Sequence, residues 1–317
     1  MSTYKEIQGT AVQNVAGDPS NPIIGEVWYN STAGTFRVRR TVVVSSWATG
    51  NPMGTARYFL GGAGTQTAAL AFGGNSNSTL TEKYNGTNWT AVNPLNLGRS
   101  RIAGAGTQTA ALGFGGYNTP GADSETESYN GTNWTAVNTL NTARYGLAGC
   151  GVSNTSALAF GGEIPGNTGA TETWNGSNWN TVNPLNQARM YMAGCGTNTA
   201  ALAVGGWAGA FAITETWNGT NWTEVGDLNT ARRGLYGTGT NTAALVFGGA
   251  PGSLNETELW NGTSWTEVNN LNTARSNLAG AGTSVVALAF GGDPTSSGYT
   301  EEWAEGPAIV TETMTTT

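Results

Sequence analysis

Short apolar runs recur along the chain at a nearly constant spacing. The run AALAF at residues 68–72 ends in the doublet Gly73-Gly74, and later runs end in doublets that begin at Gly115, Gly161, Gly205, Gly248 and Gly291. The steps between the doublets are 42, 46, 44, 43 and 43 residues. A period of this length predicts a repeat architecture in which each unit buries its faces against its neighbours.

Two further residue types mark the same period. In every unit a tryptophan precedes an arginine by ten residues, as Trp47 precedes Arg57. The other pairs are Trp89 and Arg99, Trp134 and Arg144, Trp179 and Arg189, Trp222 and Arg232, and Trp265 and Arg275. The three markers together define six units of about 44 residues each.

Each unit has the pattern of four short strands. In the first unit we expect strands at 57–64, 68–72, 81–84 and 89–92, with a tight Asn-Gly turn between the last two. The run at 68–72 is apolar on both faces, which is typical of a strand packed between neighbouring sheets. We call the four strands of each unit a, b, c and d, in chain order. Six such units predict an all-β fold, a six-bladed β-propeller.

The two ends of the array predict how the ring closes. Five units have a tryptophan five residues after the aromatic residue of strand c, but no tryptophan follows Trp303 at that distance. Trp47 is a strand d tryptophan without the rest of its unit, because no strands a to c precede it. We therefore expect residues 45–50 to supply the outer strand of the last blade. This assigns residues 1–44 to an N-terminal arm, 45–303 to the propeller and 304–317 to a C-terminal tail.

The composition argues against several classes of structure and function. Glycine accounts for 48 of 317 residues and only 10% of residues are charged, which excludes a coiled coil. Twelve Trp, ten Tyr and eight Phe argue against disorder. The formal charge of −7 disfavours nucleic-acid binding, and no apolar run is long enough for a membrane span. Since the chain has no histidine, we expect neither a metal nor a cofactor, and its first residues lack the features of a signal peptide.

Other repeated residues are expected to be structural. A glutamate follows a threonine in strand c of every unit, at Glu82, Glu127, Glu172, Glu215, Glu258 and Glu301. With the repeated arginines these predict one ion pair per blade, formed within a blade or between neighbours. Ten of the tryptophans occupy strand c or d positions and are expected to pack between blades. Cys150 and Cys195 share a small-residue position of strand a and are expected to be buried thiols, with a disulfide as the alternative.

The loop between strands b and c is where the repeats differ most in length and sequence. Variable loops on a rigid scaffold are where binding residues concentrate. The aromatic residues Tyr117, Trp207, Phe211 and Tyr299 lie in these loops and are candidate ligand-binding residues, suited to sugars, or else anchors of the loops. The loop carboxylates are Asp123, Glu125, Glu163, Glu256 and Asp293, and they show no pairing of the kind that glycosidases need. We therefore expect no enzymatic activity.

Two resemblances add to this interpretation. The paired glycines, the strand c aromatic, the strand d tryptophan and the expected closure resemble kelch-repeat propellers over about residues 45–303, although a turn of Asn-Gly replaces the usual acidic turn. Residues 18–34, with the sequence DPSNPIIGEVWYNSTAG, are similar to N-terminal parts of tail-fibre and virion-surface proteins of marine bacteriophages. That resemblance implies a virion location and a short β-hairpin arm that attaches to the particle.

The resemblance to phage proteins implies which molecules this chain would bind. The arm, with Trp28, Tyr29, Arg37, Arg39 and Arg40 as candidate attachment residues, would bind other virion proteins. The loop face would bind a host-surface glycan or protein, in a tail fibre or tail-tip component that is a homo-oligomer in the particle. Three alternatives stay open: a structural head-decoration protein without a receptor, a generic kelch interaction module, and an enzyme.

Overall fold

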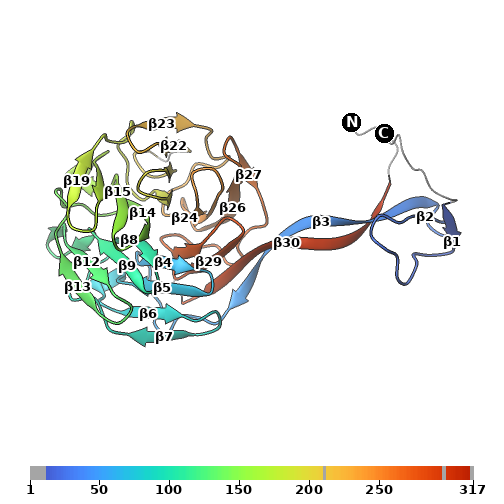
Figure 1. Cartoon of the computed structure of the whole chain (residues 1–317), viewed down its shortest axis with the longest axis horizontal. Helices are drawn as coiled ribbons and strands as arrows, with labels where there is room; N and C mark the ends of the chain where they lie inside the picture. The colour runs from blue at the N-terminus through green and yellow to red at the C-terminus, as the bar shows by residue number, and fades with distance from the viewer. Residues whose placement is uncertain (1–11, 210–211, 295–297, 315–317) are drawn as a thin grey trace. The chain divides into compact units, whose positions relative to one another are not determined.

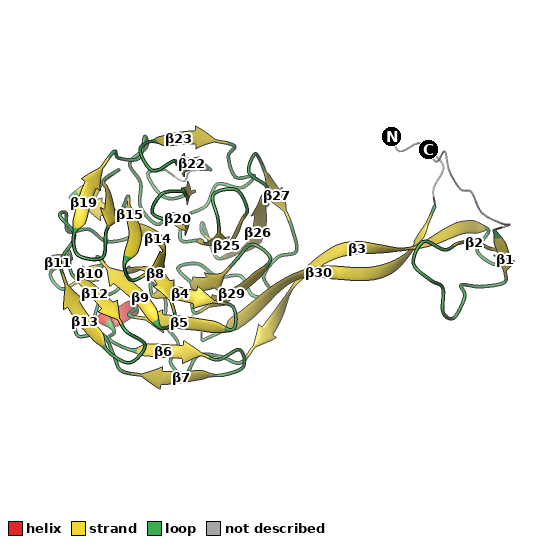
Figure 2. Ribbon diagram, viewed as in Figure 1, coloured by secondary structure: helices red, strands yellow, loops and turns green. Residues whose placement is uncertain are grey.

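The computed structural model describes residues 12–209, 212–294 and 298–314. Those residues are built from β-strands, with one 3₁₀ turn, η1 (Asn75–Asn77), and no α-helix (Figure 2). No helix there has the length and apolar character that a bilayer crossing requires. The chain divides into a propeller unit, Ser46–Ala304, and an arm unit made of Met1–Ser45 with Glu305–Thr317. The arm and the tail, treated above as separate segments, thus belong to one unit.

The propeller unit is a β-propeller in which sheets surround a central channel (Figure 1). Five sheets have four strands each, written from the channel outward. The first sheet contains β4 (Gly61–Thr65), β5 (Ala68–Phe72), β6 (Thr81–Tyr84) and β7 (Trp89–Val92), and the second contains β8 (Ala103–Thr107), β9 (Ala110–Phe114), β12 (Thr126–Tyr129) and β13 (Trp134–Val137). The third contains β14 (Ala148–Ser153), β15 (Ser156–Phe160), β18 (Thr171–Trp174) and β19 (Trp179–Val182), and the fourth contains β20 (Ala193–Gly196), β21 (Ala201–Val204), β22 (Thr214–Trp217) and β23 (Trp222–Val225). The fifth contains β24 (Tyr236–Gly239), β25 (Ala244–Gly249), β26 (Leu254–Trp260) and β27 (Trp265–Glu267).

The remaining large sheet has six strands, where the sequence predicts four. Its order is β28 (Ala279–Gly282), β29 (Val286–Phe290), β30 (Thr300–Thr313), β3 (Thr35–Gly50), β2 (Val27–Asn30) and β1 (Gln13–Val15). The innermost strands form a closed circuit of contacts, because β28 contacts both β24 and β4. Two small hairpins, β10 (Tyr117–Asn118) with β11 (Gly121–Ala122) and β16 (Glu163–Ile164) with β17 (Gly166–Asn167), lie in b–c loops.

Neighbouring sheets are held together by apolar clusters and by one repeated hydrogen bond. Each of six clusters of buried side chains combines residues of two adjacent sheets, as Phe72 packs with Trp134. The indole of Trp134 also donates to the hydroxyl of Thr81 in the preceding sheet at 3.0 Å. The same bond joins Trp179 to Thr126, Trp222 to Thr171, Trp265 to Thr214, Trp89 to Thr300 and Trp47 to Thr257. The tryptophans pack between sheets, as predicted.

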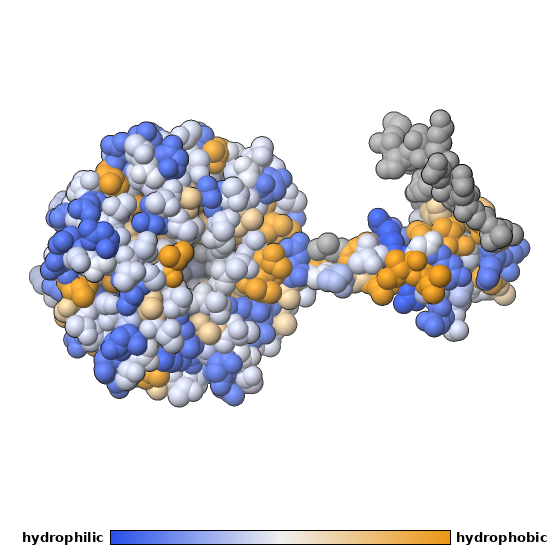
Figure 3. All heavy atoms as spheres, in the orientation of Figure 1, coloured by the Kyte–Doolittle hydropathy of each residue, from blue (hydrophilic) through white to orange (hydrophobic). Residues whose placement is uncertain are grey.

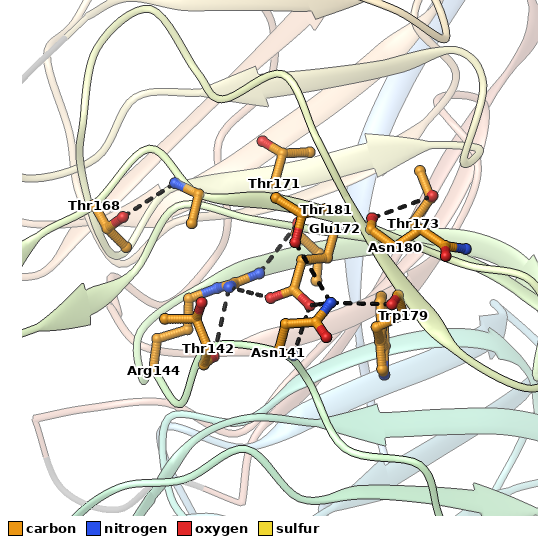
Figure 4. Close-up of polar contacts among 12 residues, drawn as sticks. Asn141, Thr142, Arg144, Thr168, Thr171, Glu172, Thr173, Trp179, Asn180 and Thr181 are labelled. Atoms are coloured by element: carbon orange, nitrogen blue, oxygen red, sulfur yellow. Dashed lines mark hydrogen bonds and ion pairs between the residues drawn. The ribbon is translucent and has the colours of Figure 1, made fainter.

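Each repeated arginine forms an ion pair with the strand c glutamate of its own unit. Their side chains are at most 4% exposed, and five pairs have N–O distances of 2.6–3.0 Å. Around Glu172 the carboxylate accepts from Arg144 and from both the backbone and the side chain of Asn141 (Figure 4). Burial lowers the pKa of Arg275 to about 10, so this guanidinium stays protonated at neutral pH. The arginines also hold the b–c loops, as Arg57 donates to the carbonyl groups of Gly73 and Leu80.

Strand a begins later than predicted. The expected strand at 57–64 is observed as β4, Gly61–Thr65. Phe59 has a φ of 55°, in the left-handed region that interrupts an extended strand. Residues 57–60 therefore belong to the face of the propeller rather than to the sheet.

The arm unit has a small core built on one carboxylate. Trp28 is fully buried, and its indole donates to Asp18 at 3.1 Å. Asn30 donates to the same carboxylate oxygen at 2.9 Å, and Arg37 pairs with the other oxygen at 3.0 Å. β2 and β3 form the expected hairpin, while the C-terminal residues form part of β30 instead of a separate docked tail.

Replacing Glu172 with alanine is expected to lower the free energy of unfolding by about 3–5 kcal/mol, because the buried guanidinium of Arg144 loses its counter-ion. Urea denaturation followed by tryptophan fluorescence measures the change. The control is Glu224→Ala in the exposed part of β23, expected to change stability by less than about 0.5 kcal/mol. Similar losses in both variants would contradict the structural role of the pair.

Acid is expected to loosen the arm through Asp18. Hydrogen bonds from Asn30 and Trp28 and the charge of Arg37 favour the ionised carboxylate and lower its pKa below 3.8, although desolvation opposes them. The contribution of Asp18 is therefore present above pH 3.8 and is lost as the pH falls through the lowered pKa. Hydrogen exchange of the amides in β2 should show this loss in the native chain. An Asp18→Ala variant with the same acid profile would refute it.

Candidate functional site

One end of the channel is bounded by a ring of six backbone hydrogen bonds. The residues of this ring lie two positions after each repeated arginine: Phe59, Arg101, Gly146, Tyr191, Gly234 and Asn277. Each of these amides donates to the carbonyl group of the preceding member at 2.7–3.2 Å, and Phe59 donates to Asn277. We call this end of the channel the mouth.

All six ring positions have a left-handed backbone, with φ between 54° and 62°. Gly146 and Gly234 adopt this conformation without a steric penalty. Phe59, Arg101 and Tyr191 adopt it at a cost of about 1–2 kcal/mol each. A residue larger than glycine at such a position costs folding free energy, which indicates that its side chain serves a purpose other than folding.

The b–c loops lie on the same face as the ring. In five units the residue before the ring member pairs with the residue that follows the Gly-Gly doublet, as in the bridges between Ser100 and Tyr117 and between Met190 and Trp207. Two of the four predicted aromatic residues, Tyr117 and Trp207, therefore lie at the mouth. Tyr299 is 50% exposed, and its carbonyl group accepts from Arg275 in the base of its loop. Phe211 lies outside the described residues.

The mouth carries an aromatic cluster around one guanidinium. The Arg101 carbon Cζ lies 4.7 Å from the ring centroid of Phe59 and 5.5 Å from those of Tyr117 and Tyr145. The rings of Tyr117 and Tyr145 meet edge to face at 5.6 Å. Phe59 stacks on Tyr191 at the same centroid distance. We call these five residues the mouth cluster.

A second cation lies beside this cluster. The Cζ atom of Arg233 is 3.9 Å from the ring centroid of Trp207, which is close enough for strong cation–π attraction. Burial raises the pKa of Tyr191, while the charges of Arg101 and Arg233 lower it, so both cations act on this one hydroxyl. Burial, with a hydrogen bond to Glu163, raises the pKa of Tyr145 to about 12. Both tyrosines are hydrogen-bonding phenols at neutral pH.

The channel contains two small cavities of about 90 Å³ each, one at each end, and Tyr236 lines both. Tyr236 occupies a position of strand a where the other units have glycine or alanine, and its hydroxyl donates to Gly62 at 3.4 Å. The cavity at the mouth has the volume of about three water molecules. A sugar-sized ligand would therefore lie on the mouth, with only a small group entering it.

The opposite cavity is lined by Cys150 and Cys195, which are free and buried, as predicted. Burial raises the pKa of Cys195 to about 12, so this thiol is protonated and unreactive at neutral pH. Within the described ranges, no three His, Cys, Asp or Glu side chains are grouped to hold a metal.

The candidate attachment residues differ in exposure. Trp28 is fully buried and is a core residue of the arm. Tyr29 is half-buried against Phe36 at a centroid distance of 5.1 Å. Arg37 is paired with Asp18 and Arg40 with Glu312, whereas Arg39 is half-buried and its backbone pairs with Gly25 and Glu26. Exposed apolar side chains are also present in this unit, at Val12, Ile23, Ile24, Phe36, Val44 and Ile309 (Figure 3).

The sequence prediction missed Phe59, Arg101, Tyr145, Tyr191 and Arg233. They lie in the two residues after each repeated arginine, which read YF, SR, YG, MY, RG and SN in the six units. This variable pair is embedded in an otherwise repeated segment, and comparing the units position by position would have revealed it.

Replacing Gly146 with alanine is expected to lower the free energy of unfolding by about 1–3 kcal/mol. The new Cβ atom would lie 2.9 Å from the ring of Tyr191, at a φ of 62°. Urea denaturation measures the loss, and near-ultraviolet circular dichroism should report the displaced tyrosine. Gly121→Ala, in a b–c loop with open space around it, is the control. Equal stability of the two variants would contradict the tight packing at the mouth.

Comparisons with known proteins bear on the fold alone. No protein-family model matches the sequence, and no curated protein matches it. A solved structure titled "Structure of YjhT" superposes with a TM-score of 0.64 at 12% sequence identity and covers 83% of this chain and 99% of that chain. At this identity the likeness supports the β-propeller fold and carries no function to this chain.

Proposed function

We propose that this chain is a structural protein on the surface of a bacteriophage particle and that its propeller binds the host surface through the mouth. The observation that carries the binding role is the mouth cluster. Four ring positions hold side chains larger than glycine in a left-handed backbone, and three of these side chains gather with Tyr117 and Tyr145. A merely structural ring would be cheaper with glycine throughout.

The position of the cluster also favours binding over packing. Between the sheets the same kinds of residue repeat in every unit, whereas the pair of residues at the mouth differs from unit to unit. Trp207 leaves 36% of its surface exposed there, beside a cation. Amphipathic aromatic residues and arginine are the side chains that dominate binding energy at recognition surfaces.

The virion location rests on the resemblance of residues 18–34 to phage tail-fibre and virion-surface proteins. In this proposal the arm unit binds other virion proteins, and several copies in one particle make weak sites into firm attachment. Exposed apolar side chains such as Ile23, Ile24 and Phe36 support a contact role for the arm. The expectation that the chain has no enzymatic activity stays a prediction.

We further infer that the six-stranded sheet serves as the sixth blade, with β3 as its outer strand. Trp47 in β3 makes the indole bond to Thr257 that each other strand d tryptophan makes to its preceding sheet. Asn272 donates to the carbonyl group of Trp47, just as Asn96 donates to that of Trp134. The six-membered ring at the mouth supports the same count.

Host adsorption of particles that carry Trp207→Ala tests the proposed function. We expect the adsorption rate to fall about tenfold or more, as for the loss of an aromatic binding residue. The control is Leu80→Ala, which removes an apolar side chain that is 39% exposed in another b–c loop. Equal adsorption of the two variants and the wild type would refute binding through the mouth.

Removal of residues 1–40 separates attachment from binding in the same assay, since Trp47 and the end of β3 remain. Such chains should be absent from purified particles while retaining the far-ultraviolet spectrum of a β-propeller. Normal incorporation would refute attachment through the arm.

A further inference from the structure

The arginines of the propeller fall into two groups. Six are buried against a glutamate of their own sheet: Arg57, Arg99, Arg144, Arg189, Arg232 and Arg275. The other two, Arg101 and Arg233, form no ion pair with any described residue, and both lie at the mouth. A chain of net charge −7 thus has two guanidinium groups without ion pairs at the mouth.

Arg101 is surrounded by aromatic rings and makes a side-chain hydrogen bond to Tyr191. Its guanidinium carbon lies near the rings of Phe59, Tyr117 and Tyr145, so aromatic contacts occupy the space around the group. Its Nε atom is buried without a hydrogen-bond partner. The five N–H donors of arginine lie in the plane of the group, and the terminal pair suits the two oxygens of a carboxylate or a phosphate.

Arg233 lies one residue before the ring member Gly234. Its guanidinium stacks on Trp207, whose backbone is fixed by Met190 and by the side chain of Asn167. Tyr191 contacts the surroundings of both residues: its ring stacks on Phe59, against which Arg101 lies, and its carbonyl group accepts from Gly234, the residue after Arg233. Glu163 is the acidic group beside them, and it is engaged by the hydroxyl of Tyr145.

We propose that the mouth binds an anionic saccharide, with an oxyanion group bound by Arg101 and Arg233. Arg101 lines the cavity of about 90 Å³, which accepts a group of this size, while the sugar ring lies outside the cavity, against Trp207 and beside Arg233. This inference rests on the proposed function and specifies the ligand class of that site.

Binding of the full chain to paired glycans tests the inference. One pair is an oligogalacturonate and its methyl ester, which differ in the carboxylate charge. The other is a phosphorylated mannose oligosaccharide and its dephosphorylated form. We expect at least one anionic member to bind about tenfold more tightly than its neutral partner, with the stronger pair identifying the oxyanion, and raised salt should weaken the preference.

Arg101→Gln and Arg233→Gln should each remove most of that preference, whereas Arg233→Lys should retain part of it because the charge remains. Lys83→Gln is the matched control, since Lys83 lies on β6 and donates to Gly131 away from the mouth. Urea denaturation verifies that each variant is folded. If Arg101→Gln is unstable, the loss of preference in Arg233→Gln alone tests the inference.

Equal binding of charged and neutral partners, a preference that survives both glutamine variants, or no binding to any of the four glycans would overturn the inference. The adsorption assay with Trp207→Ala separates this failure from failure of the proposed function. If Trp207→Ala lowers adsorption while the glycans show no charge preference, the mouth binds a host ligand of another class.

Discussion

The buried ion pair between an arginine and a glutamate is the interaction on which the propeller depends. Desolvation makes such a pair a weak source of net stability compared with apolar residues of similar volume, but its geometry is demanding. In four units it joins the segment that enters the blade, strand c and both ends of the b–c loop, as the contacts of Arg57 with Glu82, Gly73 and Leu80 illustrate. The pair therefore fixes where each loop leaves the sheet, and the loop beyond it can vary in sequence.

The periodic part of the fold could be predicted from the sequence because each periodic residue has a local physical task. Trp134 fills the space between two sheets, Glu127 neutralises Arg99, and the Asn130-Gly131 turn closes a hairpin. Repetition multiplies these signals sixfold, so the strands of the first unit were placed correctly except for strand a, which begins four residues later and ends one residue later than predicted. The length of β3 and β30 could not be predicted, because strand pairing between the two ends of the chain leaves no periodic trace.

The mouth was predicted only in part for a related reason. Tyr117 and Trp207 lie in visibly variable loops, whereas Arg101 and Tyr191 lie next to a repeated arginine and look like the beginning of a strand. A left-handed φ is normally signalled by glycine, and only two of the six ring positions carry one. The conformation is imposed instead by the ring of backbone hydrogen bonds, which is a tertiary feature.

The ring also makes neighbouring positions depend on each other. The side chain of Tyr191 lies over Gly146, and that of Asn277 lies over Gly234, where an added Cβ atom would be 2.9 and 2.5 Å away. Arg101 also lies over the preceding ring member, because its guanidinium carbon is 4.7 Å from the ring centroid of Phe59. Tyr191 and Asn277 therefore each depend on glycine at the preceding ring position. Because six copies of either residue would leave no glycine to lie over, these residues cannot repeat in every unit, and the mouth that contains them is asymmetric, as a site for a single ligand needs to be.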